Sequence, residues 1–328
     1  NHIISTNEGS AIAAGMGYHL ATNRVPLIYM QNSGLGNIVN PYNSLLHKNI
    51  YNIPFLLLIG WRGEPGTNDE PQHTFQGEIT LDLLDLLGIN FMVIDEDTEI
   101  ENILETIEKS VSEKEQLAIV VKRNTFESDS RSFDKSSSST KRSVALENII
   151  EKFDNSSLFI STTGKLSREL YELRVNSGRD NDDFYVVGGM GHASAIATGI
   201  LHEIEDKKIV CLDGDGSILM HMGHLSLVAK KHYKNFIHIV FNNSAHESVG
   251  GQPNDYAILD RNKLFEALGY KENIFIKNIS EIENYDFKNL VGPVYIEIEV
   301  ENSSSKNLMR PDKPPVVNKE SFVKKIHE

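Results

Sequence analysis

Two apolar stretches of the chain each run directly into residues that can bind a metal ion. The first leads into Asp213-Gly-Asp-Gly-Ser217, where Asp215 stands between two glycines, and the second begins at Phe236 and ends at Asn242 and Asn243. Mg²⁺ prefers oxygen ligands and takes few of them from protein, so a carboxylate and an amide oxygen would leave room for phosphate oxygens. Glycines let the backbone approach such phosphates closely. The pattern predicts a magnesium ion that holds a diphosphate, and the simpler alternative is a helix cap followed by an Asn turn.

The elements around these residues alternate between strands and helices, which predicts a parallel sheet covered by helices on both faces. Open parallel sheets bind ligands beyond the carboxyl ends of their strands. The loops at that edge should therefore gather around one site, and they begin at Thr162, Gly188, Asp213 and Asn242. Further expected elements in this half are strands Leu158–Ser161, Phe184–Val187 and Val294–Glu299 and helices 144–153, Leu166–Asn176, Ala193–Leu201 and Lys263–Leu268.

The first part of the chain has the same alternation. Strands are expected at His2–Ser5, Val25–Met30, Phe55–Ile59, Phe91–Ile94 and Leu117–Lys122, and helices at Glu8–Thr22, Glu78–Leu87 and Glu99–Ser110. A serine-rich segment without apolar periodicity separates the halves and is typical of a linker. We therefore predict an α/β protein of two three-layer parallel-sheet domains, at residues 1–125 and 144–328, joined by a linker at 126–143.

Composition excludes several classes of protein. The chain has 328 residues and a net charge of −14, which argues against general nucleic-acid binding. No apolar run approaches the roughly 20 residues of a membrane helix. Cys211 is the single cysteine, so no intrachain disulfide can form, and its apolar strand indicates a small buried side chain. A reducing cytoplasm fits this cysteine usage.

The Gly214-Asp215-Gly216 sequence with the paired asparagines resembles the cofactor motif of thiamine diphosphate-dependent enzymes. By position, the resemblance implies that Asp215, Asn243 and the carbonyl of Ala245 are the Mg²⁺ ligands. It implies that Gly216 and Ser217 donate to the diphosphate at a helix start. Asn242 is expected to secure the loop. Ser244 departs from the family, whose members usually carry glycine there.

Two other segments resemble the same family. The helix that opens Asn7-Glu-Gly-Ser-Ala11 resembles the one whose glutamate hydrogen-bonds N1′ of the aminopyrimidine, which implies that Glu8 promotes removal of the thiazolium C2 proton. Without the resemblance, Glu8 would be an acidic residue favoured by a helix N-terminus. The Gly188–Gly191 loop resembles the family's loop that grips the pyrimidine. This resemblance implies that the Gly188 carbonyl accepts from the 4′-amino group and that Met190 wedges under the cofactor. Thr163 and Gly164 are expected to contact the cofactor as well.

Within this family the chain resembles the two-domain decarboxylases of phosphonopyruvate and sulfopyruvate. Two segments, Gly60–His73 and Ala245–Pro253, favour the phosphonopyruvate type. The implied reaction converts 3-phosphonopyruvate to phosphonoacetaldehyde and CO₂ in phosphonate biosynthesis, with thiamine diphosphate and Mg²⁺ as cofactors. Arg62 would bind the phosphonate in a bidentate manner, and His73, His246 and Lys165 would assist or protonate the intermediate.

The alternatives are a sulfopyruvate decarboxylase, an acetolactate-synthase-like carboligase and a cofactor-binding protein without catalysis. For each cation the competing interpretation is a solvated surface side chain. Gln31–Ser33 is either part of the substrate site or a turn. Glu8 and Asp215 lie in different domains, and in the family such domains meet across a subunit interface. The resemblance therefore implies a homo-oligomer that binds a small anionic 2-keto acid, with no membrane or nucleic-acid partner.

Overall fold

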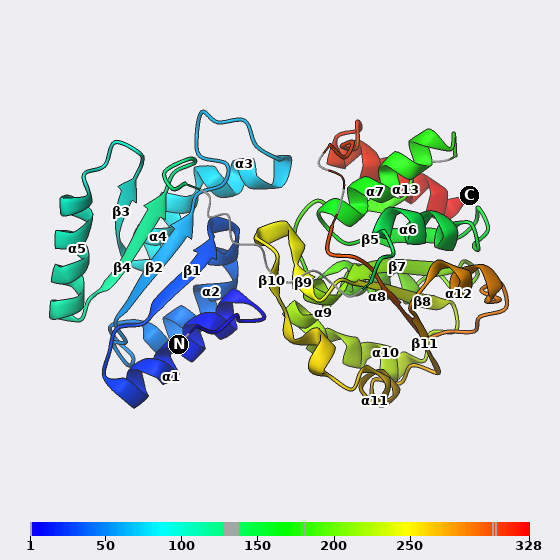
Figure 1. Ribbon diagram of the computed structural model, residues 1–328, viewed down its shortest axis with the longest axis horizontal. Helices are drawn as coiled ribbons and strands as arrows, with labels where there is room; N and C mark the ends of the chain where they lie inside the picture. Colours follow the sequence, from blue (N-terminus) through cyan, green and yellow to red (C-terminus); the bar gives the residue numbers. More distant parts are fainter. Residues whose placement is uncertain (1, 128–137, 180–181, 304, 306) are drawn as a thin grey trace. The chain divides into compact units, whose positions relative to one another are not determined.

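The computed structural model describes residues 2–127, 138–179, 182–303, 305 and 307–328 (Figure 1). The chain divides into two compact units, Asn1–Arg131 and Ser132–Glu328. Most of the expected linker at 126–143 lies outside the described residues. Helix α6 (Arg142–Ile150) begins inside the last two residues of that segment, slightly earlier than expected.

The first unit consists of a small parallel sheet and its helices. The strands are β1 (Leu27–Gln31), β2 (Phe55–Gly60), β3 (Asn90–Ile94) and β4 (Gln116–Val121). The α-helices are α1 (Glu8–Thr22), α2 (Leu35–Pro41), α3 (Pro71–Glu78), α4 (Thr80–Leu87) and α5 (Ile100–Glu113), with short helical turns at Asn32–Gly34 and Tyr42–Leu46.

The order of this sheet is β1-β2-β4-β3, and every pair of strands is parallel. Alternate residues of its strands enter separate apolar clusters on the two faces. In β2, Leu57 belongs to the cluster that includes Ile12 of α1, whereas Leu56 belongs to the cluster that packs against Ile103 of α5. The unit is therefore three layers deep, as expected from the alternation of elements.

The second unit is larger and is built in the same way. Its main strands are β5 (Leu158–Ser161), β6 (Phe184–Tyr185), β7 (Ile209–Gly214), β8 (Phe236–Asn242), β11 (Glu272–Ile276) and β12 (Val294–Glu299). Besides α6, its helices are α7 (Lys165–Asn176), α8 (Ala193–Leu201), α9 (Asp215–His221), α10 (Ser226–Lys231), α11 (Arg261–Ala267), α12 (Ile279–Asn284) and α13 (Pro315–His327). Short 3₁₀ turns lie at Met222–Leu225, Glu247–Val249 and Asp255–Ile258, and β9 (Ala245–His246) pairs with β10 (Gln252–Pro253).

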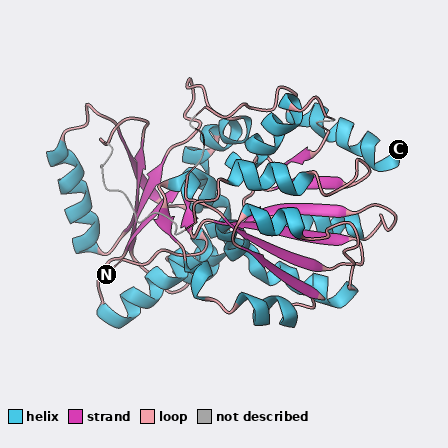
Figure 2. Cartoon of the chain, turned by 45° about the vertical axis from the view of Figure 1, so that its right-hand side comes forward, coloured by secondary structure: helices cyan, strands magenta, loops and turns pink. Residues whose placement is uncertain are grey.

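The larger sheet has the order β11-β12-β8-β7-β5-β6 with parallel pairing throughout. Figure 2 shows its strands side by side with helices on both faces. In β7, Val210 packs into the cluster of α6 and α7, and Cys211 packs into the opposite cluster, which contains Ala197 of α8. Cys211 is fully buried, as predicted.

The predicted fold class is confirmed in both units, but one expected strand does not form. Residues 2–5 have no regular secondary structure, although His2–Ser5 was expected to be a strand. Strand β6 ends at Tyr185 and is shorter than expected, while β11 was not expected. No helix in the described part of the chain is both long and apolar enough to cross a membrane.

Candidate active site

The carboxyl edge of the larger sheet brings together most of the residues singled out in the second half of the sequence. Strands β8, β7, β5 and β6 are consecutive neighbours, so the segments that follow them meet at one edge. These segments begin at Asn243, Asp215, Thr162 and Val186. The expected gathering of loops is therefore confirmed, and it follows directly from the parallel order of the strands.

Asp215 is the first residue of α9 and is 3% exposed. Asn254 donates from Nδ2 to Oδ2 of Asp215 at 2.8 Å. Burial raises the pKa of Asp215 to about 6, although hydrogen bonds from Asn254 and from the backbone of Gly216 and Ser244 oppose this rise. Burial therefore destabilises the ionised carboxylate of Asp215, and a bound cation would stabilise it.

Two asparagines lie close to the sheet, one at the end of β8 and one in the loop that follows it. Asn243 is 6% exposed, and its Oδ1 accepts from the N–H of Ala245 at 3.1 Å. Asn242 secures the loop, since its Nδ2 donates to Glu297 at 2.9 Å and its Oδ1 accepts from the N–H of Ser244 at 3.0 Å. Ser244 has a φ of 57°, which explains why glycine is favoured at this position.

The glycine loop after β6 packs onto the start of α9. A Cβ on Gly216 would lie 2.9 Å from Nδ1 of His246 and 3.5 Å from Cε of Met190. A Cβ on Gly191 would lie 3.0 Å from the carbonyl oxygen of Ser217, and Gly191 has a φ of 90° that also favours glycine. Met190, Gly216 and His246 therefore meet at one point, and burial lowers the pKa of His246 so that a neutral ring is favoured.

Hydroxyl groups tie the loops of this edge to one another. Ser217 is 2% exposed and accepts from the N–H of Gly191 at 3.1 Å, and its Oγ lies 3.0 Å from Oγ1 of Thr162. Thr163 donates to the carbonyl of Val187 at 2.8 Å. Gly164 has a φ of 94° and precedes α7. These contacts hold the segments after β5, β6 and β7 in fixed relation.

The residues of this edge fit a magnesium ion and a diphosphate. A carboxylate, an amide oxygen and a backbone carbonyl are the hard donors that Mg²⁺ takes from proteins. Gly216, without a Cβ, leaves space that any larger residue would fill against His246. Backbone N–H groups at the start of a helix suit the phosphate oxygens. Which of these residues would touch the cofactor remains a prediction.

In the first unit, the side chain of Glu8 is held by two elements that follow β1. Nδ2 of Asn37 donates to Oε2 of Glu8 at 2.7 Å. A Cβ on Gly34 would overlap the Glu8 side chain, with Oε1 only 2.6 Å away. Helix α1 begins where Asn7 accepts from the N–H of Ser10 at 2.8 Å. Glu8 is half-buried, so its carboxylate is oriented by Asn37 and by the space that Gly34 leaves.

Arg62 lies directly after β2, where its guanidinium makes a bidentate ion pair with Asp69. That pairing raises the pKa of Arg62 and holds the pKa of Asp69 well below its usual range. His73 lies in α3, and burial, followed by the charge of Arg62, lowers its pKa. Asn32 braces the backbone of Arg62, accepting from its N–H at 3.0 Å and donating to its carbonyl at 2.8 Å.

The structure thus groups the singled-out residues within each unit. In the first unit, Arg62 and His73 follow β2, whereas Glu8 opens α1, which precedes β1. Within the Gln31–Ser33 segment, Asn32 is a buried brace and Ser33 donates to Gln31 at 2.8 Å, an arrangement that favours the turn interpretation.

Three residues of these edges were missed by reasoning from the sequence: Asn37, Glu247 and Asn254. Lys165, which the sequence offered as an anion-binding cation, instead pairs with Glu247 at 3.0 Å. Asn37 and Asn254 act through contacts with Glu8 and Asp215, which are distant in sequence. No local motif marks them.

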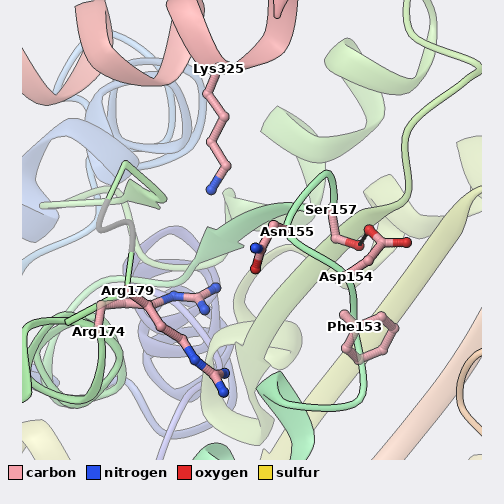
Figure 3. A pocket seen from close by; sticks show the side chains of 7 residues that line it. All are labelled: Phe153, Asp154, Asn155, Ser157, Arg174, Arg179 and Lys325. Carbon is pink, nitrogen blue, oxygen red and sulfur yellow. Dashed lines mark hydrogen bonds between the residues drawn. The ribbon is translucent and has the colours of Figure 1, made fainter. Parts of the chain in front are cut away.

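A separate pocket lies at the opposite edge of the larger sheet (Figure 3). It is lined by Phe153, Asp154, Asn155, Ser157, Arg174, Arg179 and Lys325. Ser157 precedes β5, so this is the amino edge of the sheet. Arg174 and Lys325 bind Asp183 at 2.7 and 3.2 Å, and Arg179 binds Glu151 at 3.1 Å. Because these cations are already paired with carboxylates, the pocket is a weaker candidate than the carboxyl edge.

Comparison with known proteins assigns both units to the thiamine diphosphate enzymes, the family that the sequence motifs resemble. Residues 162–298 match the family described as thiamine pyrophosphate enzyme, C-terminal TPP binding domain, where thiamine pyrophosphate (TPP) is another name for thiamine diphosphate. Residues 1–86 match the corresponding N-terminal TPP binding domain.

Three relatives illustrate the similarity. The chain is 32% identical to a phosphonopyruvate decarboxylase of Streptomyces viridochromogenes, over 96% of this chain and 82% of that protein. It is 31% identical to a phosphonopyruvate decarboxylase of Streptomyces hygroscopicus, over 96% and 81%. A sulfopyruvate decarboxylase subunit beta of Methanocaldococcus jannaschii is 32% identical over 57% of this chain and 97% of that subunit.

Fold, carboxyl-edge site and sequence similarity together define the class of protein. The chain belongs to the thiamine diphosphate-dependent enzymes. Within them it is a 2-keto acid decarboxylase that depends on thiamine diphosphate.

Proposed function

We propose that the protein decarboxylates 3-phosphonopyruvate to phosphonoacetaldehyde and CO₂, with thiamine diphosphate and Mg²⁺. The observation that carries this proposal is the match over 96% of the chain to proteins named phosphonopyruvate decarboxylase. A product aldehyde that retains the phosphonate suits the biosynthesis of aminophosphonates. The single, buried cysteine fits a reducing cytoplasm as the place of the reaction.

The residues of the second unit would hold the cofactor. Asp215, Asn243 and the carbonyl of Ala245 would bind Mg²⁺, while Gly216 and Ser217 would contact the diphosphate. The Gly188 carbonyl, Met190, Thr163 and Gly164 would hold the rest of the cofactor. Thiamine diphosphate, when bound, accepts the electron pair released as CO₂ leaves.

The residues of the first unit would serve proton transfer and substrate binding. Glu8, oriented by Asn37, would share a proton with N1′ of the aminopyrimidine. Arg62 would bind the phosphonate with donors not used by Asp69, and the added negative charge would raise the proton affinity of His73. His73 is the proposed proton donor to the product, and His246, whose neutral ring is favoured by burial, would assist at the substrate site.

Decarboxylation of sulfopyruvate is the second candidate, because a relative that matches 57% of this chain is named a sulfopyruvate decarboxylase subunit. A sulfonate carries one negative charge, whereas a phosphonate carries up to two near neutral pH. The pairing of Arg62 with Asp69 favours neither anion. Only direct comparison of the two substrates separates these candidates.

We further propose that the protein works as a homo-oligomer with sites shared between chains. The relative that matches 57% of this chain is named a subunit, so that relative belongs to an assembly. Glu8 and Asp215 lie in different units, and family resemblance pairs such units between neighbouring copies. Sedimentation in the presence of thiamine diphosphate and Mg²⁺ tests this, and a fully active monomer would contradict it.

The proposed reaction is tested by measuring aldehyde release from phosphonopyruvate and from sulfopyruvate. The protein is first dialysed against a chelator, and thiamine diphosphate and Mg²⁺ are then added singly and together. We expect turnover only with both additions and a higher kcat/KM for phosphonopyruvate. Turnover without either addition would refute the cofactor assignment, and a higher kcat/KM for sulfopyruvate would refute the substrate assignment.

A further inference from the structure

Glu247 connects the proposed metal loop to two cationic residues elsewhere in the second unit. Its carboxylate accepts from Nη1 of Arg142 at 2.6 Å and from Nζ of Lys165 at 3.0 Å. It also accepts from Nδ2 of Asn243 at 3.4 Å. The side chain of Glu247 is 10% exposed, so these contacts are made largely out of solvent.

Arg142 is buried and is fixed by a second carboxylate. Its Nε and Nη2 donate to the two oxygens of Glu169 at 2.7 and 3.0 Å. Burial alone would lower the pKa of Arg142, but Glu169 and Glu247 raise it above its ordinary value. A buried ion-pair network seldom increases stability relative to apolar packing, so its value lies in the geometry that it imposes.

The geometry that Glu247 imposes concerns the amide of Asn243. Glu247 accepts from Nδ2 of Asn243 at 3.4 Å, so the NH₂ end of this amide faces Glu247. The amide oxygen is thereby directed away from Glu247, on the side where it accepts from the N–H of Ala245 at 3.1 Å. Residues that fix a ligand in this way commonly change metal affinity by about 10–100-fold when they are removed.

Lys165 extends the same connection to the loop after β5. It follows Gly164, and a Cβ on that glycine would lie 3.5 Å from Oγ of Ser248, the residue after Glu247. The ion pair between Lys165 and Glu247 therefore ties the Thr162–Gly164 loop to the loop after β8. One carboxylate holds both the proposed metal loop and a loop expected to contact the cofactor.

We propose that Glu247 is a positioning residue that turns the amide oxygen of Asn243 toward Mg²⁺, and that Arg142 holds Glu247 in place. This inference rests on the proposed function, since it assumes that Asn243 binds Mg²⁺ beside thiamine diphosphate. It adds two residues, Arg142 and Glu247, that the motif does not contain.

The test measures the Mg²⁺ concentration needed for half-maximal binding of thiamine diphosphate, by isothermal titration calorimetry of the full chain. We expect Glu247→Ala to raise this concentration by about 10–100-fold. The matched control is Glu151→Ala, which removes a carboxylate that also pairs with an arginine (Arg179, Figure 3) but lies at the amino edge. The control should leave the Mg²⁺ requirement unchanged.

A double-mutant cycle distinguishes positioning from general loss of structure. If Glu247 acts through the Asn243 amide, Glu247→Ala should have little further effect in a chain that already carries Asn243→Ala. Additive effects of the two substitutions, or an unchanged Mg²⁺ requirement in Glu247→Ala, would overturn the inference.

Failure of the inference and failure of the proposed function give different results. A wild-type chain that binds thiamine diphosphate only with Mg²⁺, but releases no CO₂ from phosphonopyruvate, would refute the reaction while the cycle still tests Glu247. Binding of thiamine diphosphate that needs no Mg²⁺ would overturn both.

Discussion

Replacement of Asp215 by Asn should stabilise the cofactor-free protein and abolish its response to Mg²⁺. In the folded chain, burial raises the pKa of Asp215 from 3.8 to about 6. The folded state therefore favours the protonated carboxyl, and the stability that this gives is lost as pH rises through about 6. Asp215→Asn removes the buried charge while keeping an oxygen that can accept from Asn254.

The size of the effect follows from the shift in proton affinity. A rise from 3.8 to about 6 corresponds to about 3 kcal/mol for the ionised group at higher pH. The amide replaces one acceptor by a donor, so part of this gain is lost and about 1–3 kcal/mol should remain. For a unit of this size, that gain raises the Tm by about 3–10 °C.

Differential scanning calorimetry without Mg²⁺ is the appropriate assay, because Trp61, the single tryptophan, lies in the other unit. The gain of Asp215→Asn should appear at about pH 8 and shrink below about pH 4. In saturating Mg²⁺, adding thiamine diphosphate at about 100 times its dissociation constant should stabilise wild type by about 2.7 kcal/mol, but not the variant. A lower Tm for the cofactor-free variant at about pH 8, or an equal response to the cofactors, would refute the reasoning.

Three further predictions concern the remaining residues of the site. Arg62→Met should raise the KM for phosphonopyruvate by about 10–100-fold, because a charge-assisted hydrogen bond is lost, while calorimetry should show unchanged affinity for thiamine diphosphate; an unchanged KM would remove Arg62 from the substrate site. Gly34→Ala should displace the Glu8 carboxylate, which its Cβ would overlap, and lower kcat by about 10²-fold with little change in cofactor affinity; full turnover would show that the orientation of Glu8 is unimportant. Ser244→Gly should relieve the strain of a φ of 57°, and this relief should exceed the loss of the hydroxyl contact with Asn242. Denaturant unfolding should therefore show a free energy of unfolding that is higher by about 0.5–1 kcal/mol. A lower free energy of unfolding would mean that the hydroxyl contact outweighs the strain.

The elements that precede the site could be predicted from the sequence because their signals are local. Helix α1 was expected at Glu8–Thr22 and has those bounds. It starts at the Asn7 cap and ends at Asn23 in the left-handed conformation, and both are residue types favoured at helix ends. The motif strands β7 and β8 were likewise expected, since each is an apolar run that ends in polar residues.

The partners that orient the site could not be predicted, because they come from distant parts of the chain. Asn254 reaches Asp215 from a loop, and Arg142 reaches Glu247 from the start of α6. Such contacts depend on the folded arrangement and leave no periodic pattern in the sequence. The expected strand at residues 2–5 failed for a related reason: its apolar residues fit a strand, but no strand of the described sheet pairs with it.

Mixing two inactive variants tests most directly whether Glu8 of one chain and Asp215 of another serve the same cofactor. Glu8→Gln and Asp215→Ala are each purified, combined in equal amounts under conditions that allow chains to exchange, and assayed for CO₂ release from phosphonopyruvate. Random exchange should restore roughly one quarter of wild-type activity, because one site in four then receives an intact Glu8 and an intact Asp215 from different chains. A mixture that stays as inactive as its components after proven exchange would contradict a site shared between chains.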